Sequence, residues 1–86
     1  MRAAVVFHYF PHAGACAIRT EVSLRAGDTI LVRGHTTDFT TRLERIELDH
    51  VRIARAEAGA VVAIQVPERV RRGDVVYRLT EPRAAV

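Results

Sequence analysis

The chain has 86 residues, of which 49% are hydrophobic and 27% are charged, and its formal net charge is +3. A chain of this length forms one domain, residues 1–86, with one core, and its mixture of apolar and charged residues excludes wholesale disorder. No apolar run approaches the roughly 20 residues that a membrane-spanning helix needs, so we expect no membrane insertion.

The first third of the chain contains three stretches typical of β-strands. Ala3 to Phe10 is rich in β-branched and aromatic residues and is followed by a proline, which cannot continue a paired central strand. A second strand is predicted from Ala15 to Leu24, with a break near Thr20. Gly27-Asp28 then predicts a turn, and Thr29 to Arg33 predicts a third strand.

The stretch from Gly34 to His50, GHTTDFTTRLERIELDH, allows two opposite interpretations. Its β-branched threonines favour an extended backbone. Against this, Thr41 and Glu44 fit a capping box, and apolar residues follow at helical spacing until the next glycine. A strand with a bulge near Glu44 and Arg45 and a helix over Arg42 to Ala58 are equal alternatives from the pattern alone.

The last part of the chain predicts two more strands, Ala60 to Val66 and Val75 to Leu79. One local pattern occurs twice, as LRAGDTI from Leu24 and as VRRGDVV from Val70. Each copy has an apolar anchor, polar residues, a Gly-Asp turn and re-entry into a strand, which indicates shared turn chemistry rather than duplication. Residues 82–86 are expected to fray.

These elements together predict an all-β chain. Short strands separated by turn signals every 8–12 residues or so are typical of a barrel, which also leaves no exposed strand edge. We therefore expect a single small closed β-barrel of about six antiparallel strands. The helix over residues 42–58 is the one segment that would change the class to α+β.

The inventory of reactive residues argues against an enzyme. All 13 basic residues are arginine, and without lysine there is no P-loop phosphate lysine and no Schiff-base nucleophile. Ser23 is the only serine and has no glycine elbow around it. His8, His12 and Cys16 are spaced by four, but a proline at position 11 breaks the helix that would align them. We expect no catalytic residue, no metal, no cofactor and no GTP.

The single cysteine and the N-terminal run bear on the compartment. One cysteine cannot form an internal disulfide, which agrees with a reducing environment. The apolar run near the N-terminus is shorter than a secretory signal core and has no small-residue cleavage pattern after it. Cytoplasm is the default expectation.

Several stretches of the chain resemble the second domain of the translational GTPases, the β-barrel that follows the GTP-binding domain in elongation factor Tu. They are TTRLERIELDH at Thr40 to His50, the Ala56 to Gly59 turn leading into VVAIQV, and VRRGDVV at Val70 to Val76. HYFPHAGACAIR, GHTTDFT and VPERVRRGDVVYRL are similar to small stand-alone proteins described as translation elongation factor-like.

This resemblance implies a fold and a ligand. It implies that Thr40 to Val51 is one long strand of a closed translation-factor barrel, not a helix. In elongation factor Tu the barrel helps to hold the aminoacylated 3′ end of tRNA, and Glu47 matches a glutamate that lies against the terminal adenosine. The chain departs from the pattern at Ala60, where family members usually carry Asp.

The expected function is therefore a non-catalytic binding module that contacts RNA or a tRNA 3′ end. Guanidinium groups and exposed rings are the combination that single-stranded ligands use, and Tyr9 or Phe10 could supply the ring. The candidate RNA-binding residues are Arg42, Arg45, Glu47, His50, Arg69, Arg71 and Arg72. The alternative is a protein–protein interaction domain with a partner in translation, docked on a larger translational or RNA-modification assembly.

Overall fold

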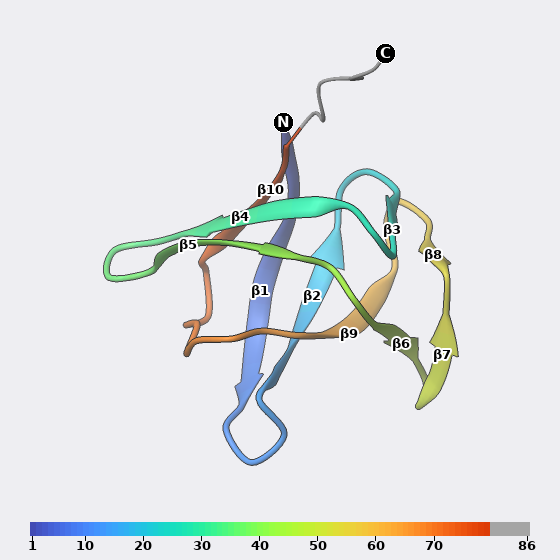
Figure 1. Cartoon of the computed structure of the whole chain (residues 1–86), viewed down its shortest axis with the longest axis horizontal. Coiled ribbons are helices and arrows are strands. Elements are labelled where there is room, and N and C mark those ends of the chain that lie inside the picture. The colour runs from blue at the N-terminus through green and yellow to red at the C-terminus, as the bar shows by residue number, and fades with distance from the viewer. Residues whose placement is uncertain (80–86) are drawn as a thin grey trace.

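The computed structural model describes residues 1–79, and in this range the chain is made of strands and their connections. The strands are β1 (Arg2–Phe10), β2 (Ala15–Thr20), β3 (Leu24–Arg25), β4 (Thr29–Arg33), β5 (Asp38–Arg42), β6 (Ile46–Leu48), β7 (Val51–Ile53), β8 (Arg55–Ala56), β9 (Val61–Gln65) and β10 (Val75–Arg78) (Figure 1). The expected all-β class is confirmed. Within residues 1–79 no helix is long and apolar enough to cross a membrane. The expected fraying of residues 82–86 lies outside the described residues.

Eight strands form one antiparallel sheet in the order β5-β4-β10-β1-β2-β9-β6-β7, and β3 pairs with β8 in a separate two-stranded sheet. Within the described part of the chain, the end strands β5 and β7 do not pair with each other, so the large sheet is an open half-barrel. The prediction of a closed barrel with about six strands was therefore wrong in both closure and strand number.

The physical reason lies in the segment that was expected to be one long strand from Thr40 to Val51. Pairing with β4 ends at Arg42, and the chain crosses to β9, where β6 begins. Three residues later Asp49 and His50 turn the chain back into β7, with φ of 52° and 66°. Such positive φ values match a two-residue hairpin turn. The segment thus supplies both ends of the sheet rather than one closing strand, and the helical alternative over residues 42–58 is excluded.

The core lies where β4 and β5 cross over β1 and β2 (Figure 1). Strands β2, β4 and β9 direct alternate residues into it, β1 buries both Ala3 and Ala4, and the largest side chains that are fully buried include Ile18, Ile30, Ile46 and Ile64. Each such side chain contributes about 1.5–3 kcal/mol by leaving water. Because the inward positions are filled by branched aliphatic residues, function must reside on the outer face or at the rims.

The two Gly-Asp turns have the same structure. Gly27 and Gly73 have φ of 101° and 93°, a region that favours glycine. The Asp28 carboxylate accepts a hydrogen bond from the Arg25 amide at 3.0 Å, and the Asp74 carboxylate accepts one from the Arg71 amide at 2.9 Å. The prediction that the repeated pattern reflects shared turn chemistry is confirmed.

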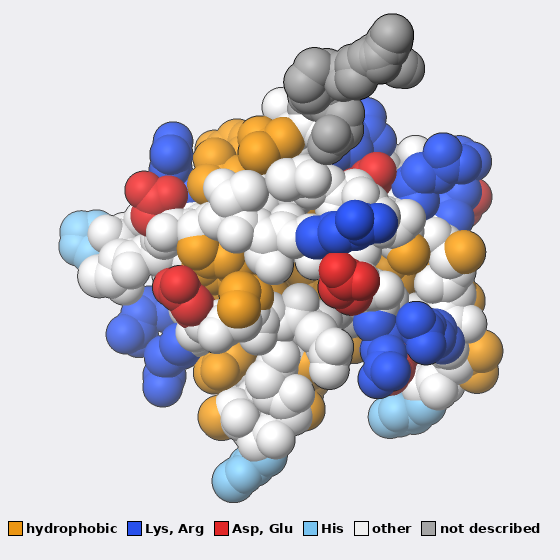
Figure 2. Space-filling model, in the orientation of Figure 1, with side chains coloured by type: hydrophobic (Ala, Val, Ile, Leu, Met, Phe, Trp, Pro, Cys, Tyr) orange, Lys and Arg blue, Asp and Glu red, His pale blue; other side chains and the backbone are white. Residues whose placement is uncertain are grey.

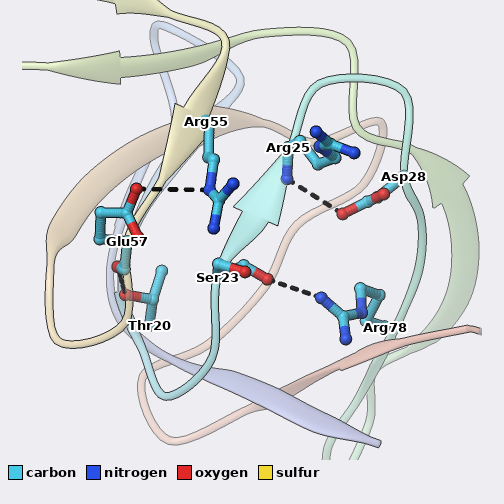
Figure 3. A network of polar contacts seen from close by, with 7 residues as sticks. All are labelled: Thr20, Ser23, Arg25, Asp28, Arg55, Glu57 and Arg78. Atoms are coloured by element: carbon cyan, nitrogen blue, oxygen red, sulfur yellow. Dashed lines mark hydrogen bonds and ion pairs between the residues drawn. The ribbon is translucent and has the colours of Figure 1, made fainter.

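A group of polar contacts ties the small sheet to the large one (Figure 3). The Thr20 hydroxyl at the end of β2 donates to the Glu57 carbonyl at 2.6 Å and accepts a bond from the Ala60 amide at 2.9 Å. On the other side, the Arg78 guanidinium of β10 donates to the Ser23 carbonyl at 2.8 Å. These bonds hold the β3–β8 end of the half-barrel in place.

Candidate functional site

A bulge in β1 turns an unusual number of rings outward. The register of β1 against β2 shifts between Val6 and His8, so Phe7 is the extra residue. Val6 is buried, whereas Phe7 and His8 are both exposed, and after the inward Tyr9 the chain exposes Phe10. Phe7 and Phe10 are each 40% accessible, and the His8 and Phe10 rings meet edge to face at 4.5 Å. The outer face of β1 is therefore lined with rings.

Beside these rings the centre of the outer face carries small alanine side chains. His8 pairs with Ala17 of β2, and Ala17 pairs with Ala63 of β9. The small side chains leave two hollows of about 420 Å³ and 190 Å³, which share Ala15, Ala63 and Glu47 in their walls. We call this continuous depression the outer groove. Its residues are Phe10, Ala13, Ala15, Ala17, Arg45, Glu47, Asp49, His50, Val61, Val62, Ala63, Ile64 and Gln65.

The wall opposite Phe10 is polar and comes from β6 and the turn after it. Glu47 pairs with Ala63 in the sheet, and Asp49 and His50 form the turn. The Arg45 guanidinium lies 4.0 Å from the Glu47 carboxylate, and both side chains are more than one third exposed. An exposed pair at this distance contributes little and exchanges readily with a ligand. Because carboxylates only accept hydrogen bonds, this wall suits a ligand that presents donors.

The structure brings together four of the seven residues predicted to bind RNA. Arg45, Glu47 and His50 line the outer groove. Arg42 lines a neighbouring hollow that shares Gln65 with the groove, and its guanidinium lies 3.7 Å from the Glu44 carboxylate. These side chains can contact one ligand that extends along the groove past Gln65.

The other three predicted residues lie apart, in the loop between β9 and β10. Arg69 stacks over the Tyr9 ring with its guanidinium carbon 5.7 Å from the ring centre. Arg71 donates to the Thr36 hydroxyl at 3.1 Å, and Arg72 lines a hollow on β1 and β2. Figure 2 shows basic side chains in separate groups, with acidic side chains between them on the viewed face. The arginines therefore do not form one continuous basic surface there.

Sequence reasoning missed the residues that form the floor and part of the ring wall. Alanines at alternate positions of β2 and β9 carry no chemical signature, and only the strand pairing places Ala17 beside Ala63. Phe7 belongs to the apolar run that predicted the first strand, and nothing in that run indicated a bulge there. Of the two rings considered for stacking, Phe10 is exposed and Tyr9 packs against the core.

The spacing of His8, His12 and Cys16 does not produce a metal site. Cys16 is fully buried on the inner face, whereas His8 and His12 are exposed. Among the described residues no group of three or more His, Cys, Asp or Glu side chains is placed to hold a metal ion. Burial raises the pKa of the Cys16 thiol to about 12, and the charge of Asp74 adds to the effect. Cys16 thus packs as a small apolar residue.

This pKa predicts that alkaline pH destabilises the fold. An unfolded thiol loses its proton near pH 8.5, whereas Cys16 in the folded chain keeps it up to about pH 12. Above pH 8.5 the unfolded state therefore binds fewer protons, and stability falls as pH rises toward 12. Between pH 8 and 10 the free energy of unfolding of the unaltered chain, measured by urea denaturation, should fall by about 1–2 kcal/mol more than that of Cys16→Ala, which lacks the thiol. Parallel pH profiles for the two chains would contradict this.

Comparisons with known proteins establish the fold and no more. No family model and no curated protein matches the chain. A crystal structure of the C-terminal domain of a U32 peptidase-family protein from Geobacillus thermoleovorans superposes with a TM-score of 0.86 at 20% identity, covering 92% of both chains. Its selenomethionine variant gives 0.84 at 22% identity, covering 88% of this chain and 96% of that one. The chain has the fold of that C-terminal domain.

This finding corrects the resemblance to the translational GTPases. The structural neighbours are C-terminal domains of a U32 peptidase-family protein, and no family model of a translation factor matches. The identification as a translation elongation factor-like protein was wrong. The role at a terminal adenosine that Glu47 was given by analogy with elongation factor Tu is therefore withdrawn. Glu47 remains a candidate because it lines the outer groove.

Proposed function

We propose that this chain is a non-catalytic binding module that holds the 3′ end of a single-stranded RNA in the outer groove. The observation that supports this most is the presence of exposed rings and acceptor groups on facing walls. Phe10 offers a stacking surface, and stacking of one base on an aromatic side chain contributes about 1–3 kcal/mol. The flat alanine floor leaves room for a base beside the ring.

The charges of the groove select the end of the strand that enters. Glu47 and Asp49 repel phosphate and accept hydrogen bonds from hydroxyl groups. A terminal ribose with free 2′ and 3′ hydroxyls satisfies both requirements, and the 2′ hydroxyl distinguishes RNA from DNA. Arg45, and Arg42 beyond Gln65, lie where phosphates of the preceding nucleotides can be neutralised.

Two further facts support a module without catalysis. Among the described residues that line the groove there is no serine, threonine or cysteine that could act as a nucleophile. The fold also occurs as the C-terminal domain of a larger protein, which is the arrangement of an accessory domain. A role in binding agrees with both.

The proposal is tested by fluorescence anisotropy with a 5′-labelled eight-nucleotide RNA. We expect the RNA with a free 3′ end to bind, and a 3′-phosphate or a DNA strand to bind about tenfold more weakly, since each loses about one charge-assisted bond. Glu47→Gln should weaken the RNA with the free end by a similar factor. The matched control is Glu57→Gln, because the Glu57 side chain is 73% exposed and its carboxylate pairs with Arg55 at the end of the small sheet, away from the groove. Equal affinity for all three strands would overturn the proposal.

The second candidate is a protein-interaction domain, favoured by apolar side chains beside the groove. Leu48 and Val51 lie outside the groove lining and are 40% and 61% exposed, and Val61 in the groove itself is 43% exposed. Replacing Leu48 and Val51 by serine should abolish binding of a protein partner and leave RNA binding within about twofold, because neither residue lines the groove. Salt separates the candidates further, because phosphate contacts weaken steeply as salt rises and apolar docking does not.

A further inference from the structure

The hollow that Arg72 lines is separate from the outer groove but lies on the same outer face, where the turn before β10 meets β1 and β2. It has a volume of about 470 Å³ and is lined by Val5, Phe7, Arg19, Glu21, Arg72 and Gly73. The bulge in β1 exposes the Phe7 ring at this hollow. Arg19 comes from β2, and Arg72 comes from the loop that contacts β1 through the Gly73 amide and the Val6 carbonyl at 2.8 Å.

The two arginines of this hollow are not neutralised by any carboxylate of residues 1–79. Within residues 1–79 neither Arg19 nor Arg72 forms an ion pair. The one carboxylate in the lining, Glu21, is bound by Arg2 through two hydrogen bonds of 2.9 Å and 3.2 Å. The hollow therefore carries net positive charge beside an exposed ring, which is the combination that binds a nucleotide with its phosphate.

The strand register places this hollow in line with the outer groove. Arg19 pairs with Val5 on one side and with Val61 on the other, and Val61 also lines the groove. Arg19 and Ala17 project from the same face of β2 two residues apart, which is about 7 Å along a strand. A single strand that leaves the groove over Ala17 can reach Arg19 without crossing an edge of the sheet.

We propose that this hollow binds the same RNA strand upstream of its 3′ end, with a base on Phe7 and a phosphate between Arg19 and Arg72. This inference rests on the proposed function of the outer groove and extends it. It gives the chain a binding site of at least about 4 nucleotides, the lower end of the range for small β-barrel domains. Occupation of both sites requires a strand that is unpaired over this length, because a duplex cannot place its bases on Phe7 and Phe10.

The test compares two RNAs with free 3′ ends, a dinucleotide and the eight-nucleotide strand. The variant Arg19→Ala with Arg72→Ala should bind the longer RNA about tenfold more weakly. The slope of its affinity against salt concentration should fall by about one phosphate contact, and its affinity for the dinucleotide should not change. The matched control is Arg25→Ala with Arg55→Ala, which removes two arginines that pair across the small sheet. Thermal unfolding of both variants verifies that the fold is retained.

The outcomes separate the two proposals. If the dinucleotide binds and the double variant binds the longer RNA with unchanged affinity, the upstream contact is overturned and the outer groove stands. If the control variant loses as much affinity as the Arg19 and Arg72 variant, the effect is a general one of net charge and the contact is again overturned. If the unaltered chain binds neither RNA, the proposed function fails and the upstream contact fails with it.

Discussion

Replacement of Gly34 by alanine is expected to destabilise the fold by about 2–4 kcal/mol, the combined cost of overpacking and of a disturbed buried hydrogen bond. A methyl group at Gly34 would overlap the carboxylate of Asp74. Asp74 is only 5% exposed, and its carboxylate is held by the Arg71 amide in the turn that leads into β10. Neither the hairpin after β4 nor this turn can move without losing its bonds. The measurement is the midpoint of urea unfolding.

A double-mutant cycle isolates the steric overlap between a methyl group at Gly34 and the carboxylate of Asp74. In an Asp74→Ala background the carboxylate is gone, so adding Gly34→Ala should cost less than about 1 kcal/mol. Asp74→Ala alone should cost about 1–3 kcal/mol, because the Arg71 amide loses its acceptor. If Gly34→Ala costs the same with and without Asp74, the overlap with the carboxylate is not the cause of the destabilisation and this explanation is overturned.

The parts of the fold that were predicted from the sequence depend on local chemistry. The strand Thr29–Arg33 was assigned with its observed bounds, because a Gly-Asp turn precedes it and a glycine follows it. The break near Thr20 was also anticipated, and β2 ends there. Both signals involve only neighbouring residues, so they fix the same strand boundaries whichever strands pair in the folded chain.

The parts that were not predicted depend on strand partners. The bulge at Phe7 is set by the register of β1 against β2, and no residue type at this position indicates it. Asp49 and His50 both adopt a positive φ, which is uncommon in residues other than glycine, so the turn after β6 was not predicted and the resemblance implied a continuous strand instead. For the same reason Glu47 and Arg45 were named as candidates, but the groove that joins them to Phe10 was not.

Replacement of Thr20 by valine is expected to cost about 2–3 kcal/mol, although the two side chains have nearly the same shape. Thr20 is 2% exposed, and its hydroxyl serves three backbone groups. Its single proton is donated to the Glu57 carbonyl at 2.6 Å, with the Ala60 carbonyl at 3.2 Å as a second, weaker acceptor, and its oxygen accepts from the Ala60 amide at 2.9 Å. Valine removes the hydroxyl partner of the Glu57 carbonyl and the Ala60 amide, and these two groups are then left with only a longer bond of 3.3 Å to each other. Urea denaturation of the two chains measures the difference.

Thr20→Ser provides the control, because serine keeps the hydroxyl and loses only a methyl group. It should cost about 1 kcal/mol, the contribution of one buried methyl. Stability is therefore expected to decrease from threonine to serine to valine. Apolar burial alone would make the valine variant the most stable of the three. A valine variant as stable as the unaltered chain would show that the small sheet is held by β3–β8 pairing and packing, and that the hydroxyl of Thr20 is dispensable.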